Sequence, residues 1–472
     1  MDQRVDCWID EHGEQMVRGL QKCLSYRTVK DSAAAKPGAP FGPAIADCLE
    51  NALAQAKELG FETKNLDGYC GCVDFGEGEE QLGILCHLDV VPAGDGWTAE
   101  PFGLTLRDGK LIGRGVIDDK GPALAALYAL RCVRDAGIEL RDAVRLVLGC
   151  DEESGMTDMV HYKAQTTPPD YGFSPDAEFP VINIEKGGIG ILLSKNTGGE
   201  GGAGIPVHSM TAGERPNVVP GFAKAVVGTN GASPEEIRAS LEALNRARGF
   251  KLTVEPIAAG LAEIAAAGLS AHASTPHLGV NAAGMLLIAL KELGAGGGSR
   301  DAIAALADLI GLSGDGKELG IAIEDELSGK LTCNLGILRY DGSHLTAQLD
   351  IRYPLSASEE KLCGQIAMAM SQARVAITRL YGHAPHHVPA DHRLVRGLIK
   401  AYSDVTGKKG YAFAIGGGTY SRCMPDTVAF GPNFPGDIDT CHMPDENFSL
   451  EKMMLSIRIM AHAIADLAGR ES

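Results

Sequence analysis

The sequence contains few aromatic residues and no long apolar segment. Phenylalanine, tryptophan and tyrosine together make up 5% of the 472 residues. No uncharged run reaches the roughly 18 apolar residues that a membrane-spanning helix needs, so we expect no membrane partner. The chain starts at Met1 without the basic segment and apolar run of a signal peptide, and we therefore expect a cytoplasmic protein.

Positive charge is also scarce. The chain has 43 lysine and arginine residues against 61 aspartate and glutamate residues, which gives a formal net charge of -18. This surplus repels nucleic acid phosphates and anionic membranes, and it excludes both as expected partners. A charged small molecule stays open, because the local field in a cleft can oppose the global charge. The 12 cysteines are not spaced as a disulfide framework, and we expect reduced thiols.

Short apolar runs alternate with helical patterns in the first third of the chain. Residues 81–91 and 143–148 have the composition of buried strands, whereas residues 12–24 and 43–59 have the periodicity of amphipathic helices. Strands that alternate with helices are typical of layered α/β sheets. The sequence therefore predicts an α/β fold with a central mixed sheet flanked by helices.

The middle of the chain differs in pattern from both ends. Its length of 472 residues favours two domains. Glycine-rich breaks and an α+β pattern fill residues 186–385, and the α/β pattern resumes after them. We therefore expect one domain made of residues 1–185 and 386–472, with residues 186–385 inserted as a separate α+β domain.

Acidic and histidine side chains follow the predicted strands where each strand ends. In an open α/β sheet, ligands bind outside the carboxyl ends of the strands. So many carboxylates at one rim repel one another unless a cation lies among them. Histidine with aspartate and glutamate suits zinc, manganese or cobalt. The segments are His87-Leu-Asp89, Asp118-Asp119, Asp151-Glu152-Glu153 and Pro175-Asp176.

Each of these segments also has an explanation without chemistry. A histidine at a strand end is usually a satisfied structural residue, and Asp118-Asp119 could simply cap the following helix. A Glu-Glu pair is commonly solvated, and an aspartate after proline commonly belongs to a turn. Their joint occurrence at strand ends favours the metal site over these separate explanations.

Four segments of the chain resemble the metal signatures of one metallopeptidase family. They are Gly83-Ile-Leu-Cys-His-Leu-Asp-Val-Val-Pro92, Gly113-Arg-Gly-Val-Ile-Asp-Asp-Lys-Gly121, Asp151-Glu-Glu-Ser-Gly155 and Ser174-Pro-Asp176. The family includes aminoacylase, carnosinase, acetylornithine deacetylase and succinyl-diaminopimelate desuccinylase. The longer form with a large lid is most similar to the PepV-type dipeptidases, and the likeness extends from about residue 80 to the last predicted helix.

The resemblance implies a catalytic domain with two adjacent divalent metal ions. Zinc is the first expectation, with manganese or cobalt as alternatives. One ion would be held by His87 and Asp176 and the other by Glu153 and His442, with Asp118 bridging them. His442 competes with His386 and His387 for its role, and its position after the glycine segment favours it.

The resemblance also implies the catalytic groups of this domain. Glu152 would be the general base, and Asp89 would accept the free ring N–H of His87 and fix its tautomer. The peptide bond between Asp118 and Asp119 would be cis.

The inserted domain would act as a lid that supplies further groups. His272, in Ser270-Ala-His-Ala-Ser274, matches a lid histidine that stabilises the oxyanion, and the alternative is a structural histidine. Arg352 matches an arginine that binds the substrate carboxylate, and the alternative is a salt bridge within a strand. The remaining expected substrate contacts are Asn217, Gly416 and Gly417.

The leading functional hypothesis is hydrolysis of dipeptides that have a free N-terminus. Deacylation of N-acyl amino acids would use the same metal ligands and differ only at the amine side of the pocket. A non-catalytic peptide-binding protein that retained the fold is a third hypothesis. Because the enlarged lid of similar proteins mimics a partner subunit, we expect a monomer that binds a small peptide.

Overall fold

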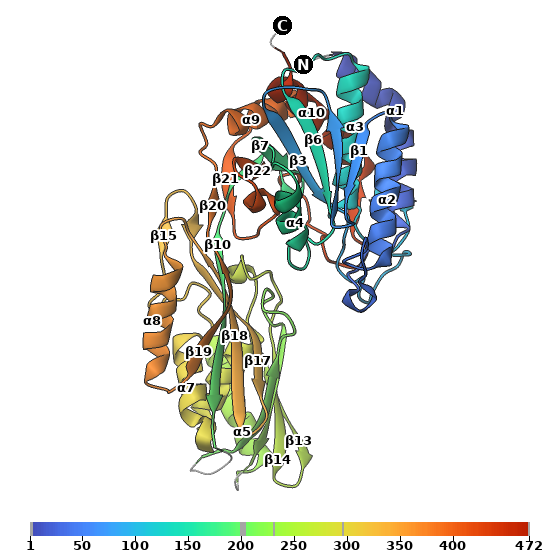
Figure 1. Ribbon diagram of the computed structural model, residues 1–472. Coiled ribbons are helices and arrows are strands. Elements are labelled where there is room, and N and C mark those ends of the chain that lie inside the picture. The colour runs from blue at the N-terminus through green and yellow to red at the C-terminus, as the bar shows by residue number, and fades with distance from the viewer. Residues whose placement is uncertain (1–2, 199–203, 230–231, 295–296, 471–472) are drawn as a thin grey trace. The chain divides into compact units, whose positions relative to one another are not determined.

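The computed structural model describes residues 3–198, 204–229, 232–294 and 297–470. The chain forms two compact units (Figure 1). The first unit consists of residues 1–184, 386–413 and 418–472, and the second unit consists of residues 185–385 and 414–417. Within the described residues, none of the helices has both the length and the apolar character needed to cross a bilayer.

A mixed sheet forms the centre of the first unit (Figure 1). Its strands are β1 Glu62–Leu66, β2 Cys70–Phe75, β3 Gln81–His87, β6 Ala143–Gly149, β7 Tyr171–Ser174, β9 Val181–Glu185, β20 His386–His387, β21 Ala412–Ile415 and β22 Thr427–Ala429. The order is β1-β2-β6-β3-β7-β22-β9-β20, and β21 pairs with β9. Parallel pairs β6–β3, β3–β7 and β7–β22 lie beside antiparallel pairs β1–β2 and β2–β6, which confirms the predicted α/β class with a mixed sheet.

Helices cover both faces of this sheet. They are α1 Gln3–Leu24, α2 Pro43–Glu58, α3 Lys120–Asp135, α4 Thr157–Gln165, α9 Arg393–Thr406 and α10 Leu450–Ala468, with short 3-10 turns at Ser32–Ala34 and Tyr420–Cys423. Successive side chains of a strand point to opposite faces. Ile84 of β3 therefore packs into the large core with α1, α3 and α10, whereas its neighbour Leu85 packs into a smaller core with Met159 of α4.

Two short pairings join distant segments of the first unit. β5 Lys110–Ile112 pairs with β4 Thr105–Arg107 on one side and with β24 Asn447–Ser449 on the other. β8 Ala177–Glu178 runs parallel to β23 Pro432–Asn433. These pairings hold the C-terminal loops beside the loops that follow β5 and β7.

The second unit is built on an antiparallel sheet with the order β13-β14-β12-β11-β17-β18-β10-β19. Its helices α5 to α8 contribute apolar residues to one core with alternate residues of β10, such as Ile189 and Ile191. The strands are β10 Gly187–Asn196, β11 Val207–Ala212, β12 Phe222–Gly228, β13 Leu252–Ala258, β14 Leu261–Ala267, β17 Thr332–Tyr340, β18 His344–Tyr353 and β19 Ala376–His383. The helices are α5 Pro234–Arg248, α6 Ala282–Glu292, α7 Arg300–Leu309 and α8 Glu359–Ser371. Shorter elements are the pair β15 Glu324–Asp325 and β16 Gly329–Lys330, and 3-10 turns at Pro276–Leu278 and Gly297–Ser299.

The two-sided burial of β3 leads to a stability prediction. Ile84 is 0% exposed, so Ile84→Ala leaves a cavity beneath the site, and we expect the free energy of unfolding to fall by about 2–5 kcal/mol. Denaturant-induced unfolding followed by circular dichroism measures this change. Ile438 is 86% exposed, and the same substitution there should change stability by less than about 0.5 kcal/mol. Equal losses at both positions would contradict the assigned core.

Candidate active site

Three parallel strands deliver side chains to the same edge of the first unit's sheet. β6, β3 and β7 are neighbours, and parallel strands place their carboxyl ends together. The loop before α3 and the loop before β24 supply the remaining groups. The structure gathers six of the predicted side chains into two groups, which are His87, Glu152 and Asp176, and Asp118, Glu153 and His442. Within each group the possible ligand atoms all lie within 4.8 Å of one another.

The carboxylate of Asp118 lies between the two histidines. Its Oδ1 is 3.0 Å from Nε2 of His87, and its Oδ2 is 2.9 Å from Nε2 of His442. The same ring nitrogen of each histidine also faces a second carboxylate, with Oε1 of Glu153 3.0 Å from Nε2 of His442 and Oδ2 of Asp176 3.6 Å from Nε2 of His87. One carboxylate with an oxygen toward each group is the arrangement that a bridging ligand requires.

The electrostatics of this cluster call for a cation. Burial, together with the charge of Asp118, raises the pKa of Asp176 to about 7. Burial and the charge of Asp176 raise the pKa of Glu152 well above its usual value. Burial opposes a charge on Asp118 as well, but the close positively charged rings of His442 and His87 outweigh this effect and hold the pKa of that carboxyl well below its usual range.

The donor set also fits a divalent ion. Nε2 of His87 is buried and makes no hydrogen bond of acceptable geometry among the described residues. Imidazole and carboxylate are ligands that zinc and similar ions prefer, and a cation here would neutralise carboxylates that otherwise have to take up protons. The pKa of His442 is raised to about 11, because Asp118 and Glu153 outweigh the effect of burial, so a metal would displace a proton from this ring.

Backbone and acidic groups orient the first histidine. Nδ1 of His87 lies 2.9 Å from the carbonyl oxygen of Asp89 and 3.4 Å from its carboxylate. A proton on Nδ1 leaves Nε2 free for a metal. The acceptor nearest to Nδ1 is thus the backbone carbonyl of Asp89, and its carboxylate lies farther away. The peptide between Asp118 and Asp119 is cis, and Oδ2 of Asp119 accepts the backbone N–H of His87 at 2.9 Å.

The carboxylate of Asp89 is occupied by the turn that follows β6. Its two oxygens accept the backbone N–H groups of Glu152 at 3.2 Å and Glu153 at 3.1 Å. Asp151 anchors the same turn, because it accepts Nζ of Lys30 at 2.6 Å and the backbone N–H of Thr157 at 3.1 Å. These hydrogen bonds therefore fix the backbone of the turn that carries the two glutamates.

Asp158 is an anchor that the sequence analysis does not single out. Its Oδ2 accepts the backbone N–H groups of Cys150 at 2.6 Å and Asp151 at 2.9 Å, and also the hydroxyl of Tyr420. Asp158 stands in the first turn of α4 and is fully buried. An acidic residue in the first turn of a helix is the sequence signal that could have found it.

The two competing histidines lie elsewhere. His386 is part of β20, and its Nε2 is 2.6 Å from the carbonyl oxygen of Thr427. His387 follows in the same strand. Neither belongs to the two groups around Asp118. His442 lies in the cluster, with φ of 62° in the left-handed region.

The predicted lid residues lie in the second unit and contact one another. The backbone N–H of Ala273 donates to the carbonyl of Asn217 at 2.9 Å, which joins the loop of Asn217 to the loop of His272. Nδ1 of His272 lies 2.6 Å from Oγ of Ser274. A side chain at Gly416 would come within 2.6 Å of Cβ of Ser274, so glycine is needed for this close approach.

Arg352 joins the same group of residues through the segment that contains Gly416 and Gly417. Its Nη1 donates to the carbonyl oxygen of Gly416 at 3.3 Å. Its Nε and Nη2 bind the carboxylate of Asp350 at 2.6 and 2.8 Å. Asp350 therefore holds the guanidinium along the edge formed by Nε and Nη2, which is the salt bridge within a strand that the sequence analysis gives as the alternative.

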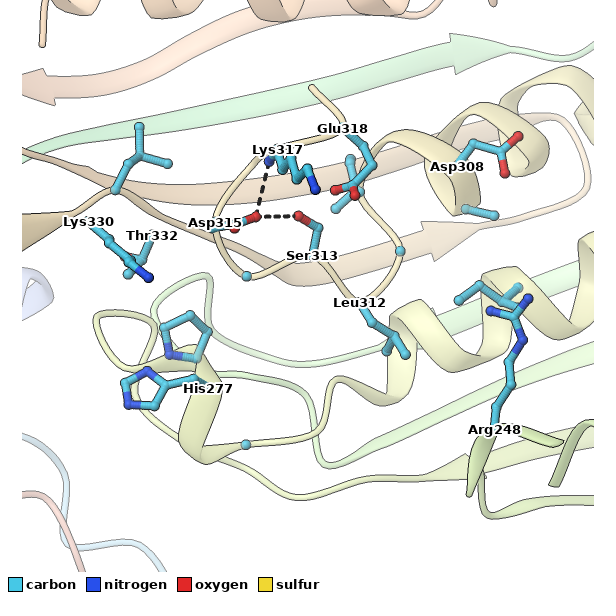
Figure 2. A pocket seen from close by; sticks show the side chains of 18 residues that line it. Arg248, His277, Asp308, Leu312, Ser313, Asp315, Lys317, Glu318, Lys330 and Thr332 are labelled. Carbon is cyan, nitrogen blue, oxygen red and sulfur yellow. Dashed lines mark hydrogen bonds between the residues drawn. The ribbon is translucent and has the colours of Figure 1, made fainter. Parts of the chain in front are cut away.

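Among the described residues, neither group of possible metal ligands lines the separate cavity of about 840 Å³ in the second unit (Figure 2). Asp315 on its wall accepts hydrogen bonds from Oγ of Ser313 at 2.9 Å and from the backbone N–H of Lys317 at 3.1 Å. Asp308 is paired with Nζ of Lys291 at 2.5 Å.

A carboxylate between two histidines, with a buried glutamate beside them, is a set of groups typical of metal-dependent hydrolases. Comparison with known proteins defines the class further. The chain belongs to the peptidase family M20/M25/M40, whose sequence pattern it matches over residues 83–466. The family comprises metallopeptidases that use divalent ions, which confirms the predicted family and enzyme class.

Individual relatives cover nearly the whole chain. The chain is 39% identical over 457 residues to "Putative dipeptidase YtjP" of Bacillus subtilis, covering 96% of this chain and 97% of the relative. It is 32% identical over 461 residues to the Beta-Ala-Xaa dipeptidase of Lactobacillus delbrueckii subsp. lactis, covering 97% of each. The fold is similar to that of Dug1p from Saccharomyces cerevisiae, with a TM-score of 0.60, 14% identity and coverage of 98% of each chain.

The contacts of Asp89 lead to a prediction about the turn after β6. Asp89→Asn replaces one acceptor by an NH₂ group that faces a backbone N–H. We expect the amides of Glu152 and Glu153 to exchange with solvent faster, on the order of tenfold. We also expect activity to fall about 10–100-fold, because the metal and base groups lose their support. Hydrogen–deuterium exchange of residues 150–156 and initial rates measure the two effects.

The exposed Asp95 provides the control for this variant. Asp95→Asn makes the same chemical change a few residues away and should alter neither the exchange nor the rate. If the amides of Asp89→Asn exchange with solvent at the wild-type rate, the hydrogen bonds of the Asp89 carboxylate do not hold the turn.

Proposed function

We propose that the protein hydrolyses dipeptides with a free N-terminus and that two divalent ions, zinc first among the candidates, occupy the cluster. The observation that supports this proposal most directly is the position of Asp118, with one oxygen toward His87 and the other toward His442. Asp176 would complete the first ion's ligands and Glu153 the second's. When bound, a pair of such ions activates water and polarises a carbonyl.

Glu152 is the proposed general base. It lies among the ligand atoms of His87 and Asp176 but has no histidine within hydrogen-bonding distance in the described contacts, unlike Glu153. Burial raises its pKa, and a carboxylate of raised pKa takes up a proton more readily. Glu152 therefore accepts the proton of the attacking water and returns it to the leaving amine.

The second unit is proposed to bind the substrate and stabilise the oxyanion. The ring of His272 is oriented through the contact of Nδ1 with Ser274, so it can donate where negative charge develops. Arg352 binds the C-terminal carboxylate of the dipeptide through its outer edge, since Asp350 already fixes the inner edge. Asn217, Gly416 and Gly417 contribute further polar contacts.

A dipeptide with a free N-terminus is favoured over an N-acyl amino acid by the names of the relatives. The relative from Lactobacillus delbrueckii is a Beta-Ala-Xaa dipeptidase, and it aligns with 97% of this chain. A monomer in the cytoplasm is part of the same proposal. All 12 cysteines are free thiols in the structure, which is consistent with a reducing compartment.

The assignment of the base is tested by Glu152→Gln. The substitution removes the proton acceptor but keeps the volume of the side chain. It changes none of the proposed metal ligands. We expect kcat to fall about 10²–10⁴-fold while the content of bound metal stays at the wild-type level. Steady-state kinetics and elemental analysis of the same sample measure both. Glu153→Gln is the matched control, and it should lose metal. Unchanged kcat in Glu152→Gln would remove Glu152 from this role.

The substrate class and the role of Arg352 are tested together. Wild-type enzyme should hydrolyse alanyl and β-alanyl dipeptides and leave N-acetyl amino acids intact. Arg352→Lys keeps the charge but loses the planar fork. We expect its kcat/KM to fall roughly 10–100-fold for dipeptides and to change little for the corresponding dipeptide amides.

Arg379 of β19 pairs with Glu359 at the surface and provides the control. Arg379→Lys should leave both substrates unaffected. Turnover of only the acetylated compounds would replace the dipeptidase proposal with a deacylase. Equal losses for dipeptides and amides in Arg352→Lys would exclude carboxylate recognition by this residue.

A further inference from the structure

A buried ion pair lies next to the metal cluster without belonging to it. The side chains of Arg114 and Glu446 are 1% and 0% exposed, and Nη1 of Arg114 lies 2.5 Å from Oε2 of Glu446. Neither residue is among the predicted ligands or catalytic groups. A buried pair of this kind offers little net stability, because desolvation of both charges offsets their attraction. The position of the pair in the fold indicates a role other than stabilisation of the folded state.

Glu446 binds the segment that leads into Asp118. Its Oε1 accepts the backbone N–H groups of Gly115 at 2.9 Å and Ile117 at 3.1 Å. Its own carbonyl oxygen accepts the backbone N–H of Gly113 at 3.0 Å. One residue thus receives four hydrogen bonds, the one from Arg114 included, from the five residues directly before the bridging carboxylate.

Glu446 is also tied to the loop that carries His442. Oγ1 of Thr440 donates to the carbonyl of Asn447 and accepts its backbone N–H, both at 3.1 Å, which closes the loop around His442. From Asn447 onward the chain pairs with β5. Glu446 therefore stands where the His442 loop meets the strand that precedes the Asp118 loop.

We propose that Glu446, held by Arg114, is a positioning residue that sets the distance between the Asp118 loop and the His442 loop. The two loops are more than 300 residues apart in the sequence, yet Nε2 of His442 lies 2.9 Å from Oδ2 of Asp118. Ligands of one ion must be placed within a few tenths of an ångström, and groups that orient them typically affect metal affinity 10–100-fold. This inference rests on the proposed function, since it concerns ligands of the proposed ions.

The indole of Trp97 provides a local probe of this pair. The guanidinium carbon of Arg114 lies 5.2 Å from the centre of the Trp97 ring. Both Nη2 of Arg114 and Nε1 of Trp97 donate to the carbonyl oxygen of Ala93, at 3.2 and 2.8 Å. The chain has 2 tryptophans, so Trp8→Phe leaves Trp97 as the sole indole reporter.

The test compares Glu446→Gln with wild-type full-length protein, using Co²⁺ as the metal. Glutamine keeps the shape, but its NH₂ group faces either Arg114 or the two backbone amides. We expect Co²⁺ affinity to weaken about 10–100-fold and the visible absorption spectrum of the Co²⁺ protein to change. We also expect kcat to fall with little change in KM, and the fluorescence of Trp97 to shift in the Trp8→Phe background.

Asp437→Asn is the matched control. Asp437 is paired with Lys452 in the same C-terminal stretch and has no contact with residues 113–117 in the described hydrogen bonds. The variant should keep wild-type Co²⁺ affinity, spectrum and kinetics. A purely structural role for Glu446 would lower the melting temperature without altering the spectrum or affinity of the folded protein.

Wild-type Co²⁺ affinity and spectrum in folded Glu446→Gln would overturn the inference. Should that variant fail to fold, Arg114→Lys decides in the same way, because it keeps the buried positive charge and changes only the guanidinium geometry. The proposed function fails separately, if the wild-type protein neither binds Co²⁺ nor hydrolyses dipeptides. An active wild type beside an unaffected Glu446→Gln would remove only the positioning role.

Discussion

Crowding of carboxylates at one edge of a parallel strand triplet is the constraint on which the site depends. The carboxyl ends of β6, β3 and β7 lie side by side, so residues far apart in sequence meet there even where their side chains carry the same charge. Two histidines around Asp118 offset part of the repulsion, and burial raises the pKa of Asp176 to about 7. A divalent cation among these carboxylates would offset the rest without the uptake of protons.

The surrounding acids show how the fold tolerates this charge. Asp89 accepts two backbone amides of the turn after β6, Asp158 accepts the amides of the two residues directly before them, and Glu446 accepts two amides and Arg114. Each of these carboxylates is hydrogen-bonded by groups that carry no ligand function of their own. They therefore fix the backbone beneath the ligands while their charge favours a cation in the centre. The same residues therefore hold the backbone in place and supply negative charge around the site.

The sequence predicts the centre of the site better than its surroundings. Side chains at the ends of neighbouring parallel strands share one edge, so their meeting follows from the order of strands and helices, whereas His442 lies on a loop and is predicted only through the family resemblance. Contacts that depend on loop conformation do not follow: the carbonyl of Asp89, not its carboxylate, lies nearest to His87, and nothing local marks Glu446 as a partner of Arg114. The helix expected over 12–24 begins at Gln3, because Gly13 is not a break but a close contact with Met454 of α10.

The second unit adds a different kind of preorganisation. Its predicted residues form one connected path, from Asn217 through the His272 loop and Ser274 to Gly416, whose carbonyl binds Arg352. Asp350 holds the guanidinium on the opposite edge before any substrate arrives. An arginine fixed in this way loses little conformational entropy on binding a carboxylate, so more of the binding energy remains for orienting the scissile bond. Because one path links the proposed carboxylate contact to the proposed oxyanion donor, both proposed roles would depend on the same loops.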